Sequence, residues 1–156
     1  MTTPSRPRRP LRTTATAIAG GLLVLTGTLH AALVVVGSLT PAPAREVPTR
    51  ELMARTSVVL GGIERSYWDL FQGFSIMMAL MIAGFGALLL LALRRAPHLV
   101  LDARGLLVLC AVVLLPGLAV SALLLPTPPI VLFGLALTAV VAALCSPARR
   151  TADWPA

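Results

Sequence analysis

Four long runs of apolar residues constrain this chain more than any other feature. They cover residues 13–37, 70–93, 105–125 and 130–145. A helix over the first run would extend ~37 Å, which is enough to cross a hydrocarbon core of ~30 Å with some tilt. Charged residues make up only 12% of the chain, against roughly 25% in soluble domains. The sequence therefore predicts an integral membrane protein.

The links between these runs predict the topology. Residues 94–104 and 126–129 are short connections, so neighbouring spans should run antiparallel. We therefore expect an all-α, four-span antiparallel transmembrane helix bundle over residues 13–145. A disordered basic arm should precede it at residues 1–12, and a polar tail should follow at residues 146–156.

The connection at residues 38–69 is long enough to hold structure of its own. Between Arg50 and Leu60 the apolar side chains recur on one helical face, so a short amphipathic helix is expected on the membrane surface or over the bundle. Gly61-Gly62 should end this helix.

All basic residues are arginine, and their distribution predicts orientation. The N-terminal arm carries four, the 94–104 connection three and the tail two, against four in the 38–69 connection. Positive residues concentrate on the cytoplasmic side of membrane proteins. We expect a bacterial cytoplasmic membrane, both termini in the cytoplasm and the 38–69 connection outside. An alternative is a cleaved signal peptide ending near Ala42-Pro43-Ala44, but the apolar run exceeds the usual length of such segments.

Composition also narrows the function classes. The net charge of +7 comes from arginines that flank apolar runs without interleaved aromatics, so nucleic acid is not an expected partner. Membrane lipids are, and a membrane protein partner or a homo-oligomer stays open. Cys110 and Cys145 form no C-x-x-C motif. Nucleophile elbows, phosphate loops and dinucleotide fingerprints are missing from the sequence, so no cofactor or metal is expected.

One histidine inside an apolar run marks a candidate site. An ionisable residue within a span is a functional hypothesis by default, and His30 is the only histidine in a span. At 1.5 Å per residue it lies ~10 Å inside the outer end of the first run. An outward-opening polar pocket is predicted there, with six candidate residues: His30, Trp68, Gln72, Ser75, Glu64 and Asp69.

The expected depths assign roles within this pocket. Gln72 and Ser75 lie ~6–10 Å below Trp68 and should meet His30 at one depth. Glu64 and Asp69 should sit nearer the mouth, and Trp68 with Tyr67 at the membrane interface, where aromatic residues gather. The simpler interpretation is that His30 and Gln72 only hydrogen bond across helices and hold them together.

Small residues on the second span predict close helix packing. Gly73, Ala83, Gly84 and Ala87 share a helical face, and such residues let another helix approach in membranes.

The layout resembles that of a known group of proteins. His30 in the first span, followed by Trp68-x-x-Phe71-Gln72-Gly73-Phe74-Ser75, resembles a family of small uncharacterised bacterial integral membrane proteins with four predicted spans. The resemblance implies the four-span architecture and lends weight to His30 and Gln72, and it implies no reaction.

Two functions follow as hypotheses. The first is a non-enzymatic accessory or lipid-facing module that carries the polar pocket. The alternative is a membrane-embedded enzyme or carrier for a lipid-soluble small molecule, with His30 as acid/base and Glu64 or Asp69 as its partner.

Overall fold

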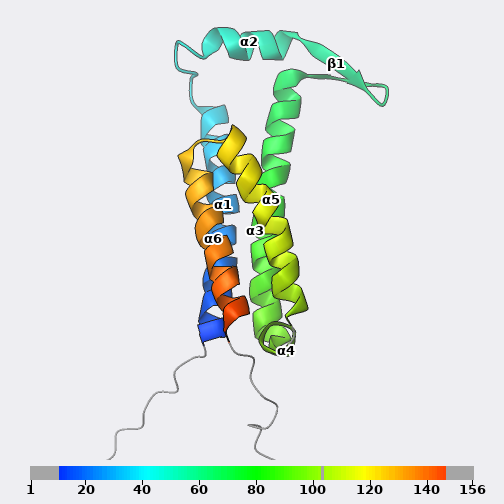
Figure 1. Ribbon diagram of the computed structural model, residues 1–156. Helices are drawn as coiled ribbons and strands as arrows, with labels where there is room; N and C mark the ends of the chain where they lie inside the picture. The colour runs from blue at the N-terminus through cyan, green and yellow to red at the C-terminus, as the bar shows by residue number, and fades with distance from the viewer. Residues whose placement is uncertain (1–10, 103, 147–156) are drawn as a thin grey trace, which may run out of the picture. The chain divides into compact units, whose positions relative to one another are not determined.

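Four long apolar helices dominate the structure (Figure 1). The computed structural model describes residues 11–102 and 104–146. Each long helix is long and apolar enough to cross a membrane. They are α1 (Leu11–Leu39), α3 (Tyr67–Arg95), α5 (Gly105–Leu124) and α6 (Thr127–Cys145). The predicted all-α fold with four antiparallel spans and a short helix after the first span is confirmed.

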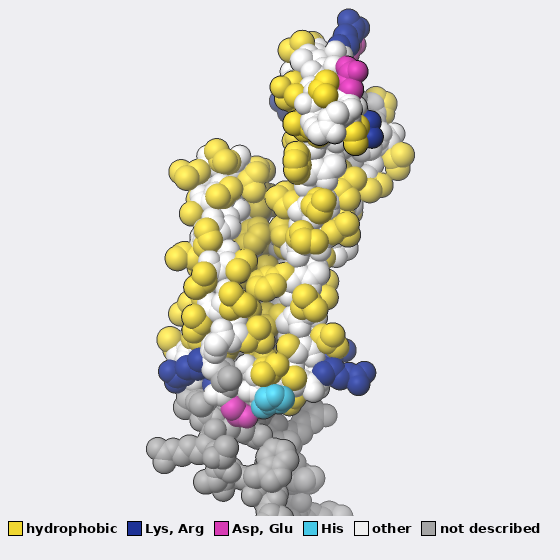
Figure 2. All heavy atoms as spheres, turned by 90° about the vertical axis from the view of Figure 1, so that its right-hand side faces the viewer, with side chains coloured by type: hydrophobic (Ala, Val, Ile, Leu, Met, Phe, Trp, Pro, Cys, Tyr) yellow, Lys and Arg dark blue, Asp and Glu magenta, His cyan; other side chains and the backbone are white. Residues whose placement is uncertain are grey.

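The helices carry apolar side chains on their outer surfaces, as expected in lipid. Leu33 is 62% exposed, Phe74 69% and Leu123 82%. Figure 2 shows hydrophobic side chains along the helices, with charged side chains gathered near helix ends. Buried hydroxyls bond within their own helices: Thr16 Oγ1 donates to Arg12 O and Ser121 Oγ to Gly117 O, both at 2.8 Å. No water is then needed to satisfy these groups.

The first two spans are longer than the sequence patterns indicated. Both α1 and α3 have 29 residues, which corresponds to ~43 Å against a core of ~30 Å. Side-chain hydroxyls extend α1 at its end, since Ser38 Oγ donates to Val34 O and Thr40 Oγ1 to Val36 O. Helix α1 begins at Leu11, so residues 11 and 12 of the expected disordered arm are helical. The rest of the expected arm, residues 1–10, and residues 147–156 of the expected tail lie outside the described residues.

By its internal contacts the chain divides into two compact units. One unit is Leu25–Ala83, and the other contains the chain up to Val24 and from Gly84 onward. In the second unit α5 packs along α6, and the short helix α4 (Pro97–Leu101) packs on α5. The fully buried positions on α5 and α6 include small residues: Cys110, Ala136 and Ala143.

Glycines bring α1 and α3 into backbone contact in each unit. A Cβ placed on Gly27 would lie 2.5 Å from Ala79 O and Ala83 N. In the other unit, a Cβ on Gly86 would lie 2.7 Å from Gly20 O. Both distances are shorter than atoms tolerate, so only glycine fits where these helices meet. From Gly20 to Gly27 along α1, the contact on α3 moves back from Gly86 to Ala83 and Ala79. The two helices therefore run antiparallel.

The small-residue face predicted on the second span is correct only in part. Ala83 lies in the contact with Gly27, whereas an added Cβ on Gly73 or Gly84 would meet nothing within 4 Å. The contacting face instead includes Ala79, Ala83 and Gly86, a face turned from the predicted one. Hydrophobicity alone does not tell which small residues face a neighbouring helix when the other side of the helix faces lipid.

A helix and a hairpin form the connection between α1 and α3. Helix α2 (Val47–Arg55) contains Pro48 in its first turn, where its missing N–H costs no hydrogen bond. Strands β1 (Ser57–Leu60) and β2 (Ile63–Ser66) follow as an antiparallel pair. In Figure 1, α2 and the hairpin lie across the start of α3.

The expected helix over residues 50–60 is wrong in its second half. It ends at Arg55, and residues 57–60 form β1. β-branched residues favour strands, and Gly61 and Gly62 have φ of +59° and +83°, as a two-residue type I′ hairpin turn requires. The two glycines therefore turn a hairpin where a helix end was expected.

The glycine contact gives a stability prediction. Gly27→Ala should lower the free energy of unfolding by about 1–3 kcal/mol, the usual cost of overpacking, because its methyl group would meet the α3 backbone. Gly21→Ala is the matched control, since its Cβ would meet nothing within 4 Å. Reversible unfolding in mixed detergent micelles measures both. Equal stability of the two variants would show that α1 and α3 do not approach this closely.

Candidate functional site at the start of the second span

A reciprocal cap fixes the start of α3. The Ser66 hydroxyl donates to Asp69 Oδ2 at 2.8 Å and accepts the Asp69 N–H at 3.1 Å, while the Ser66 N–H donates to the same carboxylate at 3.3 Å. This is a capping box with aspartate as the third residue after the cap. The predicted pocket residue Asp69 therefore holds the helix start in place and also faces the positive end of the helix dipole.

Glu64 is held on the hairpin. Its Oε1 atom accepts a hydrogen bond from Ser57 Oγ at 2.5 Å across the two strands. Both side chains are exposed. The second predicted carboxylate is thus also engaged by a neighbouring hydroxyl.

Arg50 on α2 is the residue that connects the ends of both spans. Its Nη1 donates to Gly37 O at 3.3 Å, its Nη2 lies 3.6 Å from Glu46 Oε2, and its guanidinium carbon lies 5.0 Å from the Trp68 ring centroid. The Gly37 carbonyl belongs to the last turn of α1, whose carbonyls have no partner within the helix. A cation there is favoured by the helix dipole, and the Trp68 face adds cation–π attraction.

Sequence reasoning missed this role of Arg50. The pattern placed it on the polar face of a surface helix and counted it for orientation. Glu46, four residues before it, was the one available signal, since such pairs stabilise helices. Its contacts to α1 and α3 depend on how the connection folds back.

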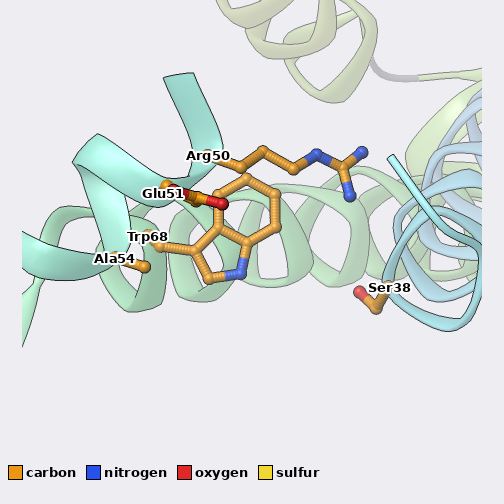
Figure 3. Close-up of a pocket in the computed structure, with 5 residues that line it drawn as sticks. All are labelled: Ser38, Arg50, Glu51, Ala54 and Trp68. Atoms are coloured by element: carbon orange, nitrogen blue, oxygen red, sulfur yellow. The ribbon is translucent and has the colours of Figure 1, made fainter. Parts of the chain in front are cut away.

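An open hollow lies beside Arg50. Its volume is ≈ 300 Å³, and its lining residues are Ser38, Arg50, Glu51, Ala54 and Trp68. Figure 3 shows the Arg50 side chain over the Trp68 ring, with the guanidinium extending toward the side on which Ser38 lies. Trp68 also stacks on Phe71, with ring centroids 5.8 Å apart. We call this the Arg50 hollow; all of it lies within the unit Leu25–Ala83.

Gln72 forms a hydrogen bond to Ser38, one of the residues that line the hollow. Its Nε2 donates to Ser38 Oγ at 2.5 Å, and Ser38 in turn donates to Val34 O. This bond links α1 to α3 at their connected ends. It is an interhelical hydrogen bond of the kind that holds spans together.

His30 lies deeper than this level. It is eight residues before Ser38, hence ~12 Å farther along α1. Its ring is half-buried, and its Nε2 atom is buried without a hydrogen-bond partner among the described residues. Ser75, one turn beyond Gln72, is half-buried as well. The structure thus places His30 and Gln72 at different depths, and the pocket predicted from all six residues stays a prediction.

Among residues 11–102 and 104–146, no three His, Cys, Asp or Glu side chains come together as metal ligands. Cys110 is buried and Cys145 exposed, and both are free thiols.

Taken with the four apolar helices, this arrangement defines the class of protein as a multi-pass membrane protein with four candidate spans. Comparison with protein families, with curated proteins and with solved structures finds no match for the chain.

Proposed function

We propose that the protein is a non-enzymatic, lipid-facing membrane module that binds a phospholipid headgroup in the Arg50 hollow. The observation that carries this is the position of an arginine beside open space at the start of a span. Trp68 lines the same space, and tryptophan and tyrosine concentrate at the headgroup level of bilayers. Phospholipid headgroups are therefore the ligands nearest to this hollow.

The chemistry of Arg50 suits a phosphate group. A guanidinium has five N–H donors, and Gly37 O and Glu46 Oε2 engage two of its nitrogen atoms. The remaining donors can bind phosphate oxygens in charge-assisted hydrogen bonds. A volume of ≈ 300 Å³ is at the lower end for small-molecule sites, which suits a headgroup rather than a whole lipid.

Orientation is part of the proposal. The arginine distribution favours cytoplasmic termini in a bacterial cytoplasmic membrane, with α2 and the hairpin outside. The hollow would then open toward the outer leaflet.

A carrier or enzyme using His30 is the second candidate. The observation in its favour is the buried Nε2 atom that lacks a partner, because such groups cost free energy and call for an explanation. A lipid-soluble molecule with a hydrogen-bond donor would supply the missing partner. The sequence predicts Glu64 or Asp69 as the partner of His30. In the structure, Glu64 accepts a hydrogen bond from Ser57 and Asp69 accepts one from Ser66.

Labelling of single cysteines tests the orientation. In a chain with Cys110→Ala and Cys145→Ala, Arg45→Cys should react with a membrane-impermeant maleimide on intact bacterial cells. His98→Cys should react only after the cells are opened, because the 94–104 connection would be cytoplasmic. Both positions are exposed, so access depends on the side of the membrane. The reverse pattern of labelling would contradict the proposed orientation.

Native mass spectrometry tests the headgroup site. The wild type, extracted from a membrane of phosphatidylethanolamine and phosphatidylglycerol, should retain one phospholipid. Arg50→Gln should bind it about 10- to 100-fold more weakly, since hydrogen bonds to charged groups contribute ~1.5–3 kcal/mol. Arg55→Gln is the control, because Arg55 is 81% exposed and pairs only with Glu51 among the described residues.

Two outcomes would reject the headgroup proposal. Equal lipid retention by Arg50→Gln and the wild type would show that Arg50 binds no headgroup. Loss of a different bound molecule from His30→Leu, with lipid retention unchanged in Arg50→Gln, would favour the carrier or enzyme.

A further inference from the structure

The tip of the β1–β2 hairpin is apolar and has little to pack against. Val59, Leu60 and Ile63 are 64%, 52% and 56% exposed. Helix α2 contacts strand β2, while the three tip side chains stay exposed. A two-stranded hairpin is at best marginally stable in water, and its outer edges offer unpaired backbone groups. Contact with an apolar surface would remove these apolar side chains from water and stabilise the hairpin.

The hairpin is held at one level relative to the membrane. Strand β2 ends at Ser66 and α3 begins at the next residue, Tyr67, with the Ser66–Asp69 cap fixing the junction. Tyr67 and Trp68 are residues that prefer the headgroup layer. The base of the hairpin is therefore placed at that layer.

The direction of the hairpin keeps its tip near the same level. Figure 1 shows it projecting sideways from the start of α3 instead of continuing along the helix axis. On α3, Tyr67, Phe71 and Phe74 are exposed and recur at the spacing of one helical face. That face belongs to a span and contacts lipid.

We propose that the hairpin tip, residues 59–63, rests in the interfacial layer of the membrane that holds the spans. The proposed binding partner of the tip is the phospholipid that surrounds α3. The apolar tip side chains contact the upper acyl chains, as the apolar faces of interfacial helices do. Arg65 is exposed and donates to Glu64 O at 3.0 Å, which leaves other N–H groups for lipid phosphates.

This inference depends on the span assignment of α3 and not on a ligand in the Arg50 hollow. A protein partner could add a strand to either edge of the hairpin. The direct connection of β2 to α3, a candidate span, favours lipid, and an experiment on the purified chain separates the two.

Fluorescence quenching in lipid nanodiscs tests the proposal. A chain with Cys110→Ala and Cys145→Ala receives a single cysteine, Leu60→Cys, and carries an environment-sensitive nitrobenzoxadiazole label. The nanodiscs contain phosphatidylcholine with or without a spin-labelled phosphatidylcholine. The control is Arg45→Cys, since the Arg45 side chain is 87% exposed and charged. Ile63→Cys repeats the measurement from the second strand.

The expected result is a blue-shifted emission at Leu60→Cys, quenching by the spin-labelled lipid and loss of quenching by aqueous iodide. Arg45→Cys should show the reverse. If the labels at residues 60 and 63 are both quenched by iodide as strongly as the control and not by the lipid spin label, the hairpin projects into water and the proposal is wrong. If a label at residue 60 prevents folding, the label at residue 63 alone tests the proposal.

Discussion

The approach of α1 to α3 through glycine is the interaction on which the rest of the structure depends. Lipid offers no hydrophobic gain for bringing two apolar helices together, so packing and interhelical hydrogen bonds decide how they meet. Gly27 meets the α3 backbone near Ala79 and Ala83, and Gly86 meets the α1 backbone near Gly20. With side chains excluded at these positions, the register of the pair has little freedom.

That register explains the chemistry at the start of α3. It brings Ser38 within hydrogen-bond distance of Gln72 and sets the last turn of α1 beside α2. Arg50 can then bond a terminal carbonyl of α1 while its guanidinium covers Trp68. Within the spans, the buried hydroxyls of Thr16 and Ser121 bond to carbonyls of their own helices.

The sequence predicts the spans well and the site only in part. Length and hydropathy identify each span, because lipid demands long apolar helices whatever their packing. The depth of His30 relative to Gln72 depends on which small residues meet, and apolar helices in lipid give no amphipathic signal for that. The hairpin was missed although Gly61-Gly62 is a recognised turn signal, because the helical pattern before it extends through Leu60. The role of Arg50 was missed because two of its partners, Gly37 and Trp68, lie on different spans.

Cross-linking between α1 and α3 measures the register of the two helices. In a chain with Cys110→Ala and Cys145→Ala, a thiol-reactive linker that spans about one helical turn, ~5 Å, is applied to two cysteine pairs. Trypsin then cuts the connection at its exposed arginines. We expect Ser38→Cys with Gln72→Cys to stay joined as one product and His30→Cys with Gln72→Cys to separate into two fragments. Joining of the His30 pair and separation of the Ser38 pair would contradict the register and return His30 to the level of Gln72.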